Sequence, residues 1–355
     1  MPTDAASPLR DLELAWQDME RQDALYRPSV CWRDASRYFV EQLRANGPEA
    51  FRSTEVANGF FSPTYGPPSN SWSRAEVDAL EAWHATTTPS AKQRMTLVHL
   101  LRGGAHALAD FRVLTAADDP ARLPRLDRFS ESGHGQPWEQ FEFEGRRFSR
   151  SALNYLLGLA FLKRHLGAEV PQVVLEIGGG FGTLGEILAS AAIPGCRYID
   201  IDIPPTQFVA QSYLSAVVGP ENVSTYADTR DLDVIDLSAL RPFSVLCPWQ
   251  LPKLQGQVDL FVNFISFQEM EPDIVENYLR HVDRLGARHV LLRNLREGKQ
   301  AIGPGVSFGV EVPTVASDYD RFLSGYGLIA TNVIPFGSRT IDGFHSELRL
   351  YRRQA

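Results

Sequence analysis

The spacing of apolar and polar residues divides the chain into two parts. Up to about residue 145, apolar residues recur at intervals of three and four in separate stretches, which is the period of amphipathic helices. We expect such helices at residues 9–26 and 32–45, from Ser73, and from Ser90 onward past Gly103. Glu76 follows Ser73 at the capping-box spacing, which is typical of a helix N-terminus.

After Ser149, short apolar runs alternate with helical stretches. Such alternation predicts an α/β fold with a mostly parallel sheet that helices cover on both faces. Asp342-Gly343, a turn signal between the last two runs, predicts that the sheet ends in an antiparallel hairpin. The expected strands are VVLEIG from Val173, CRYIDID from Cys196, PFSVLCP from Pro242, VDLFVNF from Val258, ARHVLLRNL from Ala287, LIATNVIPF from Leu328 and SELRLYRR from Ser346.

The third strand has two candidates. Residues 243–247 are favoured, because PWQLPKLQGQ then gives the short link to the fourth strand that this kind of sheet needs. Residues 224–226 are the alternative, and the segment 219–240 is otherwise an insertion. The chain as a whole then has a mainly helical region over residues 1–145, expected to cover the substrate, and a Rossmann-like domain over residues 146–355.

Composition and charge narrow the class of partner. The 355 residues carry a formal net charge of −8, which argues against a nucleic acid or an anionic membrane as partner. No apolar run approaches the roughly 20 residues that a membrane span needs. The N-terminus, MPTDAASPLRDLELAW, has no basic region and no apolar core, so we expect no signal peptide and a cytoplasmic protein.

Metal and disulfide chemistry find little support in the sequence. Cys31, Cys196 and Cys247 are scattered and odd in number, so they predict buried thiols rather than a disulfide framework or a metal knuckle. No segment shows metal-ligand spacing such as H-E-x-x-H, and we expect no metal.

A glycine-rich segment that follows one carboxylate ends the first strand. In open α/β sheets, the loop after the first strand binds the ligand. A dinucleotide fingerprint can be read as Gly180-x-Gly182-x-x-Gly185, whereas Glu176 followed by G-x-G-x-G suits S-adenosylmethionine. A phosphate gains nothing from an acid at the strand end, but the ammonium of S-adenosylmethionine does. The residues expected to bind this cofactor here are Glu176, Gly178, Gly179, Gly180 and Gly182.

The second strand ends in two acids and two prolines. Asp200 and Asp202 lie on one side of a strand, because side chains alternate with a period of two. Only Asp202 clears the strand end, so we assign it to the ribose hydroxyls of the cofactor, with Ile203 beside it. Asp200 is expected to bond to the glycine loop or to a helix N-terminus.

The segments LEIGGGFG, YIDIDIPP and NFISFQEM, with GHGQPWEQFEFEGRRFSRSALNYL before them, resemble a known family. They are similar to bacterial sugar O-methyltransferases of the nanchangmycin type, a branch of the class I S-adenosylmethionine-dependent methyltransferases. The resemblance runs from about Gly133 to Arg296 and does not extend to the first 120 residues. It implies a seven-stranded class I methyltransferase sheet and methyl transfer to a sugar hydroxyl in natural-product or glycan biosynthesis.

The acceptor site is expected after the fourth strand. Removing the proton of a weakly acidic hydroxyl requires a positioned base, and Glu269 is the leading candidate. Ser266 and Gln268 would orient the acceptor, and Asn263 would contact the cofactor or hold the loop backbone. The alternative for Glu269 is a favourable position near the N-terminus of the helix that Pro272 begins.

Further candidates come from other segments. His345, with Glu347, is the second candidate base. His134 is the third candidate and is expected to contact the substrate. Tyr65 lies in the Pro- and Ser-rich segment 60–72 and, with the aromatic residues that flank it, is expected to stack on the acceptor.

The adenine pocket depends on the third strand. If that strand is residues 243–247, Pro248 and Trp249 form the adenine wall, and otherwise Asp228 accepts from the adenine amine. Asn154 and Tyr155, on the helix before the glycine loop, would close over the methionine end or pack in the core.

The sequence is compatible with three functions. The first is O-methylation of a sugar or glycosylated small molecule, and the second is N-methylation of a small natural product. The third is a protein that binds S-adenosylmethionine without transferring its methyl group, because fold alone does not fix function. The expected partner is a small-molecule acceptor, and the sequence is compatible with a homodimer.

Overall fold

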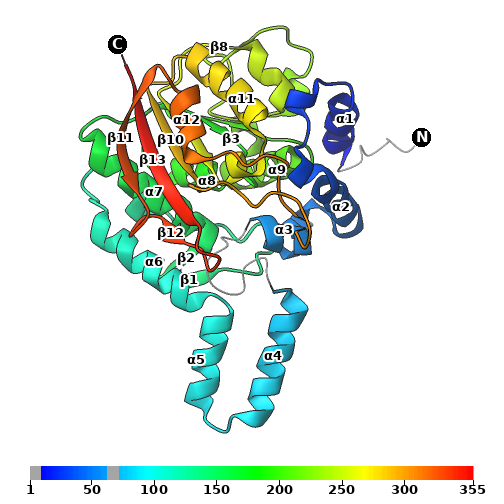
Figure 1. Cartoon of the computed structure of the whole chain (residues 1–355), viewed down its shortest axis with the longest axis vertical. Helices are drawn as coiled ribbons and strands as arrows, with labels where there is room; N and C mark the ends of the chain where they lie inside the picture. Colours follow the sequence, from blue (N-terminus) through cyan, green and yellow to red (C-terminus); the bar gives the residue numbers. More distant parts are fainter. Residues whose placement is uncertain (1–8, 62–71, 307, 355) are drawn as a thin grey trace.

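A mixed β-sheet forms the centre of the structure, a computed structural model that describes residues 9–61, 72–306 and 308–354 (Figure 1). Its strand order is β11-β13-β10-β9-β3-β4-β7-β5, with β12 paired to β13. The strands are β3 (Val173–Ile177), β4 (Arg197–Ile201), β5 (Val223–Ser224), β7 (Phe243–Leu246), β9 (Leu260–Phe264), β10 (His289–Leu295), β11 (Tyr326–Asn332), β12 (Ser338–Arg339) and β13 (His345–Arg353).

The direction of the strands confirms the predicted Rossmann-like sheet. Six adjacent strands run parallel to one another, in the order β5, β7, β4, β3, β9 and β10. β13 runs antiparallel to both of its neighbours, β10 and β11. The seven predicted strands are all present in this sheet, as β3, β4, β7, β9, β10, β11 and β13. The two-residue strands β5 and β12 are additional. β7 pairs with β4, so the favoured third strand is confirmed, and the other candidate lies outside it as the edge strand β5.

Helices cover both faces of the sheet because the buried strands present apolar residues on both sides. On β9, Val262 packs in the cluster that contains α7, α8 and α9, and Phe261 packs in the cluster that contains α11 and α12. The covering helices are α7 (Arg150–Leu166), α8 (Thr183–Ser190), α9 (Thr206–Val218), α11 (Pro272–Arg284) and α12 (Ala316–Phe322).

The region before α7 is mainly helical, as predicted. Its helices are α1 (Arg10–Met19), α2 (Val30–Asn46), α3 (Glu55–Phe60), α4 (Arg74–Thr87), α5 (Ala91–Leu101) and α6 (Gly104–Ala117). Leu12, Phe39 and Phe51 belong to the same apolar cluster as α7 to α9, so this region shares a core with the sheet domain.

Two predicted helix ends are wrong, and local chemistry gives the reason. The first helix stops at Met19, and the Asp23 side chain accepts from the Leu25 amide to begin a separate short helix, η1 (Ala24–Tyr26). The helix predicted to continue past Gly103 is divided there, because Gly103 adopts a left-handed conformation with φ of 78°. The capping box of Ser73 and Glu76 and the helix start at Pro272 are confirmed.

Short elements complete the described chain. They include the small antiparallel hairpin β1–β2, the parallel pair β6–β8 and several single-turn helices. Their bounds are β1 (Phe141–Phe143), β2 (Arg146–Phe148), β6 (Ile235–Asp236), β8 (Leu254–Gln255), α10 (Tyr226–Thr229), η2 (Pro48–Ser53), η3 (Leu126–Arg128), η4 (Pro220–Asn222), η5 (Pro248–Lys253) and η6 (Ser266–Glu269). None of the helices in the described ranges has the length and apolarity that a bilayer crossing requires.

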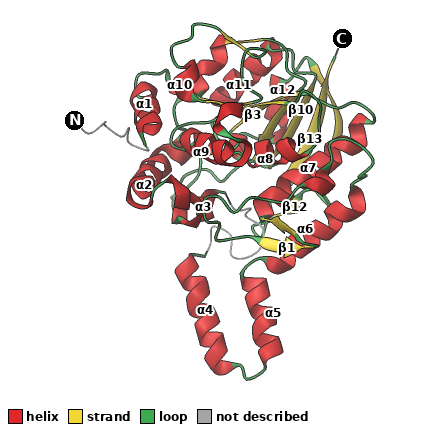
Figure 2. Cartoon of the chain, turned by 180° about the vertical axis from the view of Figure 1, so that it is seen from behind, coloured by secondary structure: helices red, strands yellow, loops and turns green. Residues whose placement is uncertain are grey.

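Helices α4 and α5 form an antiparallel hairpin that projects from the rest of the molecule (Figures 1 and 2). Val77 is the one buried residue of α4, and no residue of α5 is buried. The hairpin therefore lies outside the main core.

α7 packs closely against β9 at Gly158, and a substitution there tests this contact. A Cβ at this position would lie 2.6 Å from Cε2 of Phe264 and closer still to its Cζ. The Phe264 ring stacks on Tyr155 with centroids 4.9 Å apart, so it has little freedom to move. We expect Gly158→Ala to lower the free energy of unfolding by about 1–3 kcal/mol, the usual cost of overpacking, although alanine favours a helix.

Denaturant unfolding measures this change, and Gly59→Ala provides the matched control. Gly59 is also helical, but a Cβ there meets no atom within 4 Å. The control should be as stable as the wild type or slightly more stable. Equal stability of the two variants would show that α7 is not held tightly against β9.

Candidate functional site

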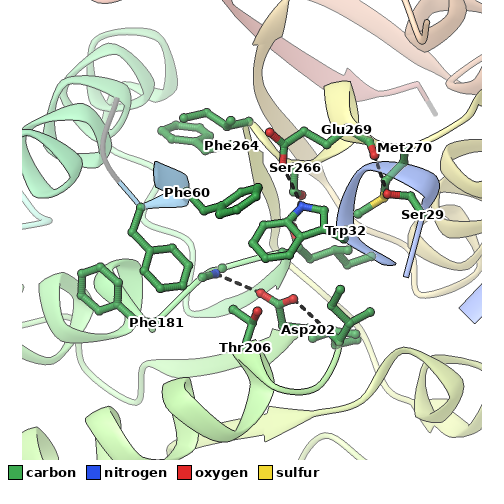
Figure 3. Close-up of a pocket in the computed structure, with 18 of the residues that line it drawn as sticks. Ser29, Trp32, Phe60, Phe181, Asp202, Thr206, Phe264, Ser266, Glu269 and Met270 are labelled. Carbon is green, nitrogen blue, oxygen red and sulfur yellow. Dashed lines mark hydrogen bonds between the residues drawn. The ribbon is translucent and has the colours of Figure 1, made fainter. Parts of the chain in front are cut away.

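A cavity opens at the carboxyl ends of β3, β4 and β9, where the strand order reverses (Figure 3). Ligands in open α/β sheets bind at such a reversal. The floor contains Gly178, Gly179 and Gly180 of the loop after β3 and Asp202 after β4. The remaining walls come from α2, α3, α7 and the segment between β9 and α11.

Strand β4 holds the glycine loop through backbone hydrogen bonds. The Gly178 amide donates to the Ile201 carbonyl at 2.8 Å. The Gly179 amide donates to Oδ1 of Asp200 at 3.2 Å, and the Gly180 amide donates to Oδ2 of Asp202 at 3.0 Å. These three amides are thus engaged by the protein itself and are turned toward β4.

Glycine is required in this loop for two separate reasons. Gly178 and Gly180 have φ of 72° and 66°, a region that residues with a Cβ rarely adopt. Gly179 lacks this constraint, but a Cβ on it would lie 2.5 Å from Asp200 and 2.8 Å from Glu176. The loop can therefore lie directly on the two carboxyl groups.

Glu176 and Asp200 form a buried pair of acids beneath the loop. They are direct partners in the register of β3 and β4, and both are 0% exposed. The hydroxyls of Tyr155 and Tyr198 donate to Glu176 at 2.7 and 2.5 Å. Oδ2 of Asp200 has no hydrogen-bond partner within the described ranges. Burial raises the pKa of Glu176 to about 7, and burial together with the Asp202 and Glu176 carboxyls raises the pKa of Asp200 well above its usual range.

Asp202 faces the cavity, and the backbone holds both of its oxygens. Besides the Gly180 bond, its Oδ1 accepts from the Ile203 amide at 2.7 Å. Each oxygen retains a further lone pair, so the carboxylate can still accept two hydroxyl donors. Burial raises the pKa of Asp202 to about 8 in the free protein.

Glu269 lies on the opposite wall, where three segments meet (Figure 3). Its Oε2 accepts from Trp32 Nε1 at 2.8 Å, and its Oε1 is 2.6 Å from Lys299 Nζ. The Ser29 hydroxyl donates to the Glu269 carbonyl oxygen at 2.6 Å. Glu269 therefore ties α2 and the segment after β10 to the end of β9.

Aromatic side chains form the roof of the cavity. Trp32 and Phe60 have ring centroids 4.3 Å apart, and Phe60 meets Phe308 at 5.5 Å. Lys299 Nζ lies 4.6 Å above the Phe308 ring. Phe61 and Phe181 meet edge to face at 5.4 Å beside the glycine loop.

The residues expected to orient the acceptor take different places. Ser266 lines the cavity, and its hydroxyl donates to the Ile177 carbonyl at 3.2 Å. Asn263 is fully buried and donates to the same carbonyl at 2.8 Å, so it supports the loop backbone. Gln268 is also buried, and its side chain accepts from the Leu295 amide at 2.8 Å.

The other predicted site residues lie away from these walls. Trp249 packs with Tyr226 behind the end of β7, and Pro248 lines the cavity in its place. His345 pairs with Glu297 at 2.6 Å at the start of β13 and does not line the cavity. His134 is exposed, and Tyr65 lies outside the described residues.

Several wall residues carried no local signal in the sequence. Ser29, Trp32 and Lys299 meet Glu269 from positions at least 30 residues away along the chain. Thr206 also lines the cavity without such a signal, whereas Asn154 is among the residues expected from the sequence, and the side-chain oxygens of both have no hydrogen-bond partner among the described groups. Over the same residues, no group of three or more His, Cys, Asp or Glu side chains is arranged to hold a metal ion.

Comparison with known proteins gives matches to solved structures. No family model and no curated relative matches the chain. Magnesium protoporphyrin IX methyltransferase (ChlM) from Synechocystis PCC 6803, solved with bound SAH, is 16% identical over 57% of this chain and 84% of its own, with a TM-score of 0.39. Mitomycin 7-O-methyltransferase MmcR is 14% identical over 100% of this chain and 74% of its own, with a TM-score of 0.37. The CcbJ methyltransferase from Streptomyces caelestis is 12% identical over 56% of this chain and 94% of its own, with a TM-score of 0.36. Likenesses at this level do not establish a family or a function for this chain.

The acid pair beneath the loop predicts a pH dependence of stability. Because the folded-state pKa of Glu176 is raised to about 7, the folded chain holds a proton that the unfolded chain has lost above about pH 4.5. Stability from this group is therefore present in acid and is lost as the pH rises through about 7. Asp200→Asn removes the like charge beside Glu176, so we expect it to raise the melting temperature at pH 8.5 by about 2 °C or more.

Thermal melting between pH 6 and 9 measures this change. The slope of melting temperature against pH should be shallower in Asp200→Asn than in the wild type. Asp231→Asn is the control, because the Asp231 side chain is 87% exposed, and its slope should equal that of the wild type. Equal slopes in all three proteins would mean that the pKa values of the acid pair are not raised in the folded chain.

Proposed function

We propose that the chain is an S-adenosylmethionine-dependent O-methyltransferase that acts on a small molecule. The observation that carries the proposal is the state of the glycine loop: the amides of Gly178, Gly179 and Gly180 bond to β4. Loops that bind the pyrophosphate of a dinucleotide need such amides free. The carboxyl groups of Glu176, Asp200 and Asp202 can ionise when a cation binds beside them, whereas a phosphate would disfavour their ionisation.

The cavity residues fit this cofactor in several respects. Asp202 offers lone pairs to the two ribose hydroxyls, and Gly178 to Gly180 allow close approach of the ligand. Ile203 and Pro248 provide apolar surface for the adenine. The unpartnered oxygens of Asn154 and Thr206 can accept from the ammonium or hydroxyl groups. When bound, S-adenosylmethionine supplies a methyl carbon that its sulfonium makes electrophilic.

Glu269 is the residue that we assign to the proton of the acceptor hydroxyl. It lines the same cavity as the loop, and Trp32 and Lys299 fix its carboxylate in position. Each oxygen keeps a lone pair with which to receive the proton. The acceptor hydroxyl must be aligned closely with this fixed carboxylate for the proton transfer to occur.

We further propose that the region before residue 145 covers the acceptor. Trp32, Phe60 and Phe61 bring aromatic surface to the cavity from α2 and α3. Such rings suit the apolar face of a sugar or the aglycone of a glycosylated metabolite. The sequence resemblance to sugar O-methyltransferases supports the same class of acceptor.

N-methylation is the second candidate, and the engagement of Glu269 favours it. An amine acceptor can be neutral before attack and needs no strong base. A carboxylate that already accepts from Trp32 and Lys299 would then orient the amine rather than deprotonate it.

Binding of the cofactor tests the role of Asp202. At pH 8.5, Asp202→Ala should weaken the binding of S-adenosylmethionine and S-adenosylhomocysteine by about 10–100-fold, because hydrogen bonds to a charged group are lost. Wild-type affinity should also rise from pH 6.5 to 8.5, since the raised pKa of about 8 leaves Asp202 protonated at the lower pH, when it cannot accept both hydroxyls. Isothermal titration calorimetry measures both effects.

The control is Asp231→Ala, which should bind as the wild type does. NAD should give no heat with any of the proteins. Heat on adding NAD, or an unchanged dissociation constant in a folded Asp202→Ala variant, would contradict the cofactor assignment.

Turnover tests the role of Glu269. Glu269→Gln should reduce methyl transfer to a hydroxyl acceptor by about 10²–10⁴-fold, the usual contribution of a general base, with little change in cofactor affinity. Transfer of a radiolabelled methyl group to a panel of glycosides and phenols measures it, with and without chelator and added magnesium.

Two further variants make this result interpretable. Glu269→Gln leaves Lys299 without its counter-ion, so the double variant Glu269→Gln/Lys299→Met provides an inactive form without a buried charge. Lys299→Met alone keeps the base and should remain active. If Glu269→Gln is as active as the wild type, an amine acceptor is the better account, and if His345→Ala is the inactive variant, the base is His345.

A further inference from the structure

The α4–α5 hairpin has a surface that the rest of the chain leaves open. α4 packs on α5 and α5 packs on α6, and the hairpin projects away from the sheet domain (Figures 1 and 2). Trp83, Met95 and Leu100 are 63%, 73% and 44% exposed. An isolated helix of 11 residues such as α5 is marginal in water, so the hairpin gains little stability from its own helices.

One face of the hairpin is shaped to receive other helices. A groove runs between α4 and α5, and all of its residues except His84 follow the i, i+3, i+4, i+7 spacing on their helix. Its floor and rims include Ala82, Ala85, Met95, Val98, Asp78 and Arg94. Small residues on the floor allow close approach of a facing helix, and Met95 projects from the same face.

Charge indicates what covers this face. Residues 73–102 contain four basic and three acidic residues, a net charge of +1, whereas the whole chain carries −8. The remainder therefore carries −9, so two copies of the chain repel each other least through the hairpin. Within the hairpin, α4 has three acids and one arginine, and α5 has Lys92 and Arg94 without an acid.

This division of charge is self-complementary. A two-fold axis parallel to the helices sets α4 against the α5 of a second copy, and the same contact occurs twice. Each acidic helix then faces a basic one. A partner of one charge sign would match one helix of the hairpin and be repelled by the other. Arg102 pairs with Glu81 and Asp78 at the base of the hairpin, but the Asp78 side chain remains 52% exposed to a partner.

We propose that the α4–α5 hairpin is a docking arm for a second copy of this chain. The two arms pack face to face as a four-helix bundle in which α4 lies against the partner's α5. Met95 enters the groove of the facing arm. Because the axis is parallel to the helices, both arms project in the same direction and the two domains lie at the same end of the bundle.

Sedimentation velocity over a range of concentrations tests the arm. The wild type should be a dimer at about 10–100 µM, and Met95→Glu should raise the dimer dissociation constant at least tenfold by placing a charge in the groove. Leu232→Glu is the matched control: Leu232 is 43% exposed but lies between α10 and β6, and this variant should dimerise as the wild type does. A monomeric wild type, or an unchanged dimer in Met95→Glu, would overturn the proposal.

Charge reversal tests the arrangement of the two arms. One protein carries Lys92→Glu and Arg94→Glu, and the other carries Asp78→Lys and Glu81→Lys. Each alone faces like charge in both contacts and should be monomeric, whereas an equimolar mixture should form a heterodimer because both contacts become complementary. Circular dichroism and melting temperature check that each protein is folded. Charge-reversed chains that dimerise alone, or a mixture of folded chains that stays monomeric, would contradict the pairing of α4 with the partner's α5.

Discussion

The carboxyl groups of β4 determine the shape of the glycine loop, and the character of the cavity follows from this contact. Asp200 and Asp202 accept from the Gly179 and Gly180 amides, so the loop turns these N–H groups toward β4 and the residue after it. A site built in this way offers close approach to the backbone and carboxyl groups that a bound cation would keep ionised. It suits a cation that carries hydroxyl groups far better than a phosphate.

Glu269 connects the segment after β9 to the part of the molecule that covers the cavity. Trp32 approaches it from α2 and Lys299 from the segment after β10, so one carboxylate holds both the aromatic roof and the acceptor side. The same contacts restrict its chemistry. A carboxylate held by two donors has a fixed orientation, so the proposed methyl transfer depends on how the acceptor hydroxyl is aligned with it.

Local patterns were sufficient for the sheet and for the floor of the cavity. The apolar runs predicted the seven long strands, and the acids and glycines at the ends of β3 and β4 are adjacent because neighbouring parallel strands end at the same edge. The register also explains why Asp200 lies under the loop while Asp202 clears it. The walls are different: Trp32 and Lys299 meet Glu269 across 237 and 30 residues, and no local period encodes such a contact. Trp249 shows the same limit, since its place behind β7 depends on Tyr226 and not on its position after the strand.

The most direct test of the central claim is a crystal structure of the chain with S-adenosylhomocysteine. The account predicts the ligand at the carboxyl ends of β3 and β4, with both ribose hydroxyls about 2.7 Å from the Asp202 carboxylate and the Gly178, Gly179 and Gly180 amides still bonded to β4. A ligand bound elsewhere, or a loop that releases Asp200 and Asp202 to present its amides to the ligand, would contradict it.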